Sequence, residues 1–82
     1  MKILFSGTSL HYLKKLNPKI KVKIYEAVSK LPNQGDVKKI KGKKIKNIYR
    51  LRVGKYRILF LFKKEEDYLK ILNVDTRGDV YK

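Results

Sequence analysis

The feature that most constrains the fold is a pattern of alternating polar and apolar residues around Gly54-Lys55. Residues 47–53 alternate, and residues 56–63 are strongly apolar. A period of two residues is typical of a β-strand with one buried face. Glycine at the first position of a two-residue loop suits a type II′ turn. The pattern therefore predicts a β-hairpin with its turn at Gly54-Lys55.

The turn also predicts the register of this hairpin, because Val53 then faces Tyr56 and pairing continues outward from there. Directly paired residues point to the same face of the sheet. One face should be core material: Tyr49, Leu51, Val53, Tyr56, Ile58 and Phe60. The other should carry Arg50, Arg52, Arg57 and Leu59. We expect the three arginines to form one solvent-facing cluster.

Upstream of the hairpin, the sequence predicts a short strand and two helices. Residues 2–5 are apolar and favour an edge or flanking strand, and Thr8 or Ser9 is expected to cap a first helix. The face that this helix buries should comprise Leu10, Leu13 and Leu16. Asn17 caps a second helix with Pro18 at its first position. Its apolar stripe comprises Ile20, Ile24, Ala27, Val28 and Leu31.

Residues 32–35 end the second helix, and everything after Gly35 is predicted to be sheet. A polar turn at 64–67 leads into a third strand at 68–74, and 77–82 form a tail. The order is N-terminal strand, helical hairpin and antiparallel β-meander, which predicts an α+β fold with the helices on one face. A length of 82 residues suits a single domain, 1–82.

Charge is the second strong feature, with 22 Lys and Arg against 7 Asp and Glu and a net charge of +15. No acid lies between Asp36 and Glu65. Such an excess favours an anionic partner, nucleic acid first and a membrane surface second; a solvated, lysine-rich surface is the alternative. The interval contains a lysine run that we expect to be a phosphate-tracking loop, or a mobile solvated loop. Its members are Lys38, Lys39, Lys41, Lys43, Lys44 and Lys46.

The predicted pair of Arg52 and Arg57 points the same way. Like charges directly opposite each other in two strands repel, so folding alone gains nothing from this pair. A phosphate lying across the face would turn the repulsion into attraction. Arginines splayed apart in solvent are the alternative. Asp75 and Asp79 are candidates for orienting arginines, although acids in loops usually just meet solvent.

Several kinds of chemistry are excluded by composition. There is no cysteine, one histidine (His11) that we assign to a surface or boundary role, and no metal-ligand spacing among the acids. We therefore expect no metal and no cofactor. No stretch approaches the ~20 apolar residues of a membrane span, and the apolar run at the start of the sequence is too short for a signal peptide. A cytoplasmic location with no membrane partner is the expectation.

Two segments together resemble the RelE/ParE toxin superfamily. After Gly42, residues 48–60 read Ile-Tyr-Arg-Leu-Arg-Val-Gly-Lys-Tyr-Arg-Ile-Leu-Phe, and residues 74–81 read Val-Asp-Thr-Arg-Gly-Asp-Val-Tyr. The resemblance implies a RelE-like fold and a metal-independent endoribonuclease that cuts mRNA at the ribosomal decoding site. It implies a cognate antitoxin as inhibitor, for which we expect an amphipathic, partly acidic helix. The catalytic residues that it implies are Arg50, Arg52, Arg57, Arg77 and Tyr81.

Relatives with strong activity often carry lysines where this chain has Arg50 and Arg52, and arginine is a poor general base. Lys55, on the turn, and Tyr81 are the remaining candidates for proton transfer. Two other functions stay open: inhibition of DNA gyrase, as in ParE-type members, and non-catalytic binding to RNA or the ribosome.

Overall fold

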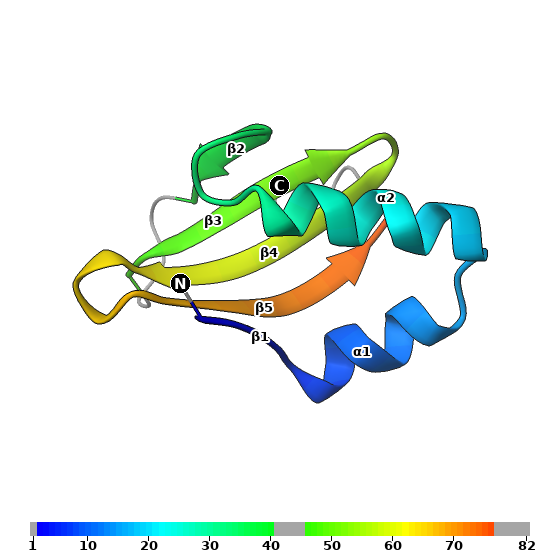
Figure 1. Ribbon diagram of the computed structural model, residues 1–82, viewed down its shortest axis with the longest axis horizontal. Coiled ribbons are helices and arrows are strands. Elements are labelled where there is room, and N and C mark those ends of the chain that lie inside the picture. The colour runs from blue at the N-terminus through cyan, green and yellow to red at the C-terminus, as the bar shows by residue number, and fades with distance from the viewer. Residues whose placement is uncertain (1, 41–45, 77–82) are drawn as a thin grey trace.

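A computed structural model describes residues 2–40 and 46–76. Their elements follow in chain order: β1 (Lys2–Phe5), α1 (Gly7–Lys14), α2 (Pro18–Ser29), β2 (Asp36–Lys39), β3 (Ile48–Val53), β4 (Tyr56–Lys63), the 3₁₀ turn η1 (Lys64–Glu66) and β5 (Tyr68–Asp75). The strands form one sheet in the order β1-β5-β4-β3-β2. Figure 1 shows α2 crossing in front of the sheet, while the end of the sheet beside η1 has no helix in front of it.

The predicted hairpin is confirmed, residue by residue. Val53 pairs with Tyr56, Arg52 with Arg57, and the same register continues to Ile48 and Leu61. Gly54 has φ +58°, the left-handed conformation that the first position of a type II′ turn requires. The short turn has therefore set the faces of both strands, as alternation predicts.

The remaining strands complete an α+β fold of the predicted order. β5 is antiparallel to β4, as the meander requires, and β1 is an edge strand parallel to β5. The opposite edge is β2, which pairs antiparallel with β3. The prediction of a lysine loop is therefore wrong in part, because Lys38 and Lys39 lie in a strand that forms backbone hydrogen bonds with β3. Lys41, Lys43 and Lys44 lie outside the described residues.

The first helix begins earlier than predicted. Ser6, not Thr8 or Ser9, is the cap, and its Oγ accepts a hydrogen bond from the Ser9 backbone N–H at 3.1 Å. Ser9 is buried, and its hydroxyl lies 2.8 Å from the Ser6 carbonyl and 3.4 Å from the Ile71 carbonyl. Because Ser9 and Leu13 turn toward the sheet, Leu10 is rotated to the flank and is 41% exposed, contrary to expectation.

The second helix follows the prediction. Asn17 Oδ1 accepts from the Lys19 N–H at 2.8 Å, and Pro18 is the first helical residue. Its stripe packs on the predicted apolar face of the hairpin, so the core lies between the helices and the sheet. The buried members of this core are Leu13, Ile24, Val28, Leu31, Leu51, Tyr56, Ile58, Phe60, Leu69, Ile71 and Val74.

Candidate nucleic-acid interface

The sheet face opposite the helices carries all three arginines of the hairpin, and we call it the arginine face. The registers of three neighbouring strand pairs place four charged residues in a single row across it. Asp36 of β2 pairs with Arg52 of β3, Arg52 with Arg57 of β4, and Arg57 with Asp75 of β5. This charged row has an acid at each end and two arginines between them.

Arg57 is the buried member of the charged row. Its side chain is 7% exposed, and its Nε lies 3.8 Å from Oδ1 of Asp75. A guanidinium removed from water needs a charged or hydrogen-bonding partner, and Asp75 provides the charge. Asp75 lies within β5, so it is not an acid in a solvated loop.

Arg50 lies in the next row, where Lys38, Leu59 and Asn73 are its neighbours across the strands. Its Nη2 lies 3.8 Å from Oδ1 of Asp36, diagonally across β2 and β3. The Arg50 side chain is 11% exposed, and its buried Nη1 has no hydrogen-bond partner among the described residues. Asp36 is itself 62% exposed, so this pair is open to solvent on one side.

Arg52 differs from both of its neighbours on the arginine face. It is exposed, and within residues 2–40 and 46–76 no ion pair involves it. The prediction of one cluster on one face is therefore confirmed, but the prediction that all three arginines face solvent is wrong. Arg57 and Arg50 are covered because acids from β5 and β2, outside the hairpin, hold them against the sheet.

The predicted lysines divide between two faces. Lys38 shares the arginine face, Lys39 is paired with Tyr49 on the opposite face, and Lys46 is exposed before β3. Lys55 is exposed on the hairpin turn, with Nζ 5.7 Å from the centre of the Tyr56 ring. Arg77 and Tyr81 lie outside the described residues, so their placement beside the arginine face stays a prediction.

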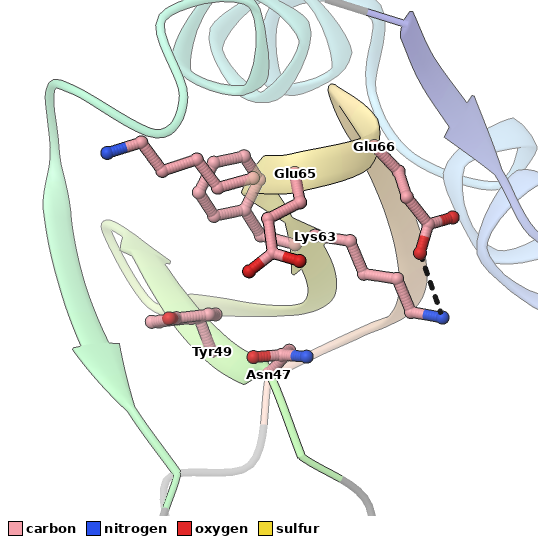
Figure 2. A pocket seen from close by; sticks show the side chains of 7 residues that line it. Asn47, Tyr49, Lys63, Glu65 and Glu66 are labelled. Carbon is pink, nitrogen blue, oxygen red and sulfur yellow. Dashed lines mark ion pairs between the residues drawn. The ribbon is translucent and has the colours of Figure 1, made fainter.

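A separate hollow of about 390 Å³ opens near η1, at the end of the sheet away from the Gly54 turn. Figure 2 shows Asn47 and Tyr49 on one side of it and Lys63, Glu65 and Glu66 on the other. Lys63 Nζ and Glu66 Oε2 are 3.7 Å apart. Sequence reasoning missed this hollow, because its walls come from the ends of different strands. The carboxylates of Glu65 and Glu66 oppose a phosphate there, so the arginine face is the better candidate.

Two further findings bear on the chemistry. Among the described residues, no group of three or more His, Cys, Asp or Glu side chains has the arrangement needed to hold a metal ion. In the same part of the chain, no helix is long and apolar enough to cross a membrane.

Comparison with known proteins assigns the family. The model of the ParE toxin of the type II toxin–antitoxin system matches residues 3–81, nearly the whole chain. The chain belongs to this family of toxins. A comparison with curated protein sequences found no match. The resemblance to the RelE/ParE superfamily that the hairpin and the C-terminal segment indicate is thereby confirmed.

Solved structures of RelE toxins agree with this family assignment. The toxin of the RelB–RelE complex from Methanococcus jannaschii is 33% identical, with 95% of this chain and 94% of that chain covered and a TM-score of 0.67. The RelBE2 toxin–antitoxin complex from Mycobacterium tuberculosis gives 28% identity, 93% and 96% coverage and a TM-score of 0.75. The RelE–RelB complex from Pyrococcus horikoshii, at 22% identity, 96% and 97% coverage and a TM-score of 0.80, supports the fold alone.

Proposed function

We propose that this toxin is a ribosome-dependent endoribonuclease that cuts mRNA at the decoding site. The observation that carries the proposal is the arrangement of Arg50, Arg52 and Arg57 on one sheet face, with Arg52 exposed between two arginines held by carboxylates. One exposed guanidinium beside two that are held in place suits recognition of a phosphate, which guanidinium groups bind with several N–H donors at once.

The chemistry that fits this face uses the RNA's own nucleophile. The 2′-oxygen attacks the adjacent phosphorus, the bond to the 5′-oxygen breaks, and the products are a 2′,3′-cyclic phosphate and a 5′-hydroxyl. Arginines stabilise the extra negative charge on the phosphorane, a contribution of the electrostatic kind that is often the largest in catalysis. They stay protonated at neutral pH, so proton transfer falls to another group. Tyr81 and Lys55 are the candidates in this chain.

An antitoxin is the partner that we propose in the cell. The complexes from M. jannaschii and M. tuberculosis pair RelE-type toxins with an antitoxin. On this chain, large apolar side chains are exposed on both helices: Leu10 is 41% exposed, Val22 is 55% exposed and Tyr25 is 41% exposed. A partner with an amphipathic, partly acidic segment would cover such residues and offset the net charge of +15.

A second function, inhibition of DNA gyrase, is favoured by the family model, which is that of the ParE toxin. One experiment separates the two. Purified toxin is added to an active translation mixture, and the mRNA is mapped by primer extension. A parallel reaction measures gyrase supercoiling of a plasmid. We expect cuts within codons and unaffected supercoiling. Intact mRNA with blocked supercoiling would replace the proposal by gyrase inhibition, and neither effect would indicate a non-catalytic binding protein.

A further inference from the structure

We propose that Asp75 is a positioning residue, which holds the Arg57 guanidinium at the place where it meets the scissile phosphate. The inference rests on the proposed ribonuclease function and assigns within it a residue that touches neither RNA nor the reacting atoms. The observations that carry it are the 3.8 Å approach of Asp75 Oδ1 to Arg57 Nε and the shared position of the two residues across β4 and β5.

The pairing of Asp75 with Arg57 depends on an irregularity in the sheet. Starting beside η1, where Lys63 pairs with Tyr68, β4 and β5 pair regularly as far as Phe60 and Ile71. The register then shifts by one residue. Without this shift, Arg57 would face Val74, and Asp75 would project from the opposite side of the sheet. The extra residue in β5 is Leu72. A β-bulge of this kind re-aims the side chains that follow it, and here it turns Asp75 onto the arginine face.

The start of α1 holds this bulge in place. Ser6 donates from its backbone N–H to the Ile71 carbonyl and from its Oγ to the Leu72 carbonyl, both at 2.8 Å. Ser9, which is fully buried, also lies within 3.4 Å of the Ile71 carbonyl. The Ile71 and Leu72 carbonyls beside the bulge thus have hydrogen-bond partners in two serines. The orientation of Asp75 therefore depends on the bulge in β5 and on the two serines at the start of α1 that bind it.

Burial makes the Arg57–Asp75 pair a rigid one. The two side chains are 7% and 20% exposed, whereas Asp36, which faces Arg50, is 62% exposed. An arginine in solvent loses substantial rotamer freedom when it binds a phosphate, and a held arginine has lost that freedom already. A guanidinium has five N–H donors on separate edges, so one edge can face a carboxylate while another faces a phosphate. Nε and Nη2 of Arg57 are buried, which leaves Nη1 for the phosphate.

The proposal separates binding from the reaction rate. Asp75 is negative and repels an incoming phosphate, so neutralising it should leave RNA binding unchanged or make it tighter. The same change frees Arg57, so its positive charge no longer lies where it stabilises the phosphorane. The chemical step should then slow by about 10- to 100-fold. A residue that serves only the fold would weaken binding and rate together.

The experiment compares Asp75→Asn with the wild type in two measurements, affinity for mRNA-programmed ribosomes and single-turnover cleavage at saturating toxin. Glu26→Gln is the matched control, because it changes the net charge equally on the exposed side of α2. Thermal unfolding confirms that each variant is folded at the assay temperature. We expect the rate of Asp75→Asn to fall while its affinity holds or rises, Asp75→Glu to recover part of the rate, and Glu26→Gln to change neither quantity.

A double-mutant cycle shows whether Asp75 acts through Arg57. In an Arg57→Gln background, Asp75→Asn should cause little further loss, because the group that it positions is already absent. Additive losses, a wild-type rate in Asp75→Asn, or a parallel loss of affinity and rate would each overturn the proposal.

A direct readout keeps this inference distinct from the proposed function. In ¹H–¹⁵N spectra of the free toxin, the Arg57 Nε–H signal should be slow to exchange in the wild type and fast to exchange in Asp75→Asn. If the signal is unaffected, the positioning role is wrong even for an active ribonuclease. If the signal responds but the wild type cuts no mRNA, the ion pair stands and the ribonuclease proposal is the part that fails.

Discussion

Arg52 and Arg57 are direct neighbours across β3 and β4, yet Arg52 is exposed and Arg57 is buried. The difference comes from the ends of the charged row. Asp75 draws Arg57 against β5, whereas Asp36 lies nearest to Arg50, in the next row. Arg52 is left facing solvent beside a like charge. The two arginines should therefore respond differently to substitution.

Replacing Arg52 by threonine should stabilise the fold. The change removes the like-charge pair with Arg57 and inserts a residue that favours strands. These gains should outweigh the lost attraction to Asp36, which is 62% exposed and paired with Arg50, so the free energy of unfolding should rise by about 0.5 kcal/mol. Urea denaturation measures this difference, which should shrink in high salt. Lys70→Thr is the control, because Lys70 faces Leu61 and Leu4 rather than a basic residue. Equal effects of the two substitutions would mean that repulsion at Arg52 is negligible.

RNA binding should depend steeply on salt. If about six basic residues neutralise single-stranded phosphates, a plot of log affinity against log salt has a slope of roughly −4. Arg52→Gln should make the slope shallower by about 0.7, the amount for one phosphate contact. Lys23→Gln, on the exposed side of α2, should leave it unchanged. Titrations of labelled RNA at several salt concentrations give both slopes, and a flat dependence would assign the charge to another purpose.

Cleavage should need no divalent metal. The proposed reaction uses the 2′-hydroxyl of the RNA as nucleophile and arginines to stabilise the phosphorane, and neither role calls for a metal ion. The fragments should end in a 2′,3′-cyclic phosphate and a 5′-hydroxyl, which mass spectrometry identifies. Because ribosomes require magnesium, the metal test is run on mRNA-programmed ribosomes beside a control toxin that needs no metal, so that only a loss specific to this toxin counts. Loss of activity in EDTA and its return with a divalent ion would contradict the mechanism.

Gly35 should be the least replaceable of the described glycines. Its φ is +110°, and a Cβ built there would lie 2.8 Å from Leu51 Cδ1 in the core. Gly35→Ala should therefore lower the free energy of unfolding by about 1–3 kcal/mol through backbone strain alone, with the contact adding to it. Gly7→Ala, with nothing within 4 Å, should be neutral or stabilising. Denaturation of both variants tests the contrast, and equal effects on stability would mean that alanine at position 35 carries no backbone strain.

Tyr81 lies outside the described residues, and the role that the family resemblance implies for it makes a sharp prediction. Tyr81→Phe keeps the ring and removes the hydroxyl. If the hydroxyl transfers a proton, single-turnover cleavage should fall at least about 100-fold, with RNA binding nearly unchanged. If Tyr81→Phe cleaves normally and only Tyr81→Ala is impaired, stacking or packing is the role of the ring.

The parts of the fold that were predictable from sequence are the local ones. A two-residue turn at Gly54 fixes the register of both strands, so the faces of the hairpin follow by counting. Asn17 and Pro18 likewise mark the start of α2 within one helical turn. Ser6, which caps α1, also donates from its Oγ to the Leu72 carbonyl of β5, and the Ser9 hydroxyl reaches the Ile71 carbonyl of the same strand. These contacts join residues that are distant in sequence.

The burial of Arg57 was not predictable for the same reason. Counting from the turn at 64–67 would place Val74 opposite Arg57, and only the extra residue in β5 brings Asp75 there. The contribution of Asp36 depends on β2 forming a strand, in a segment whose lysines suggest a loop. Sequence alone therefore identified the arginines of the site and named Asp75 among the candidates to orient them, but it missed Asp36 and the burial of Arg57.

The parallel pairing of β1 with β5 fixes the order in which the molecule is completed. Lys2 pairs with Tyr68, which is synthesised 66 residues later. Until then the nascent chain has neither a neighbour for β1 nor the bulge that brings Asp75 to Arg57. Contacts this distant in sequence also form slowly. A chain still in synthesis therefore lacks the completed arginine face, in which Asp75 meets Arg57.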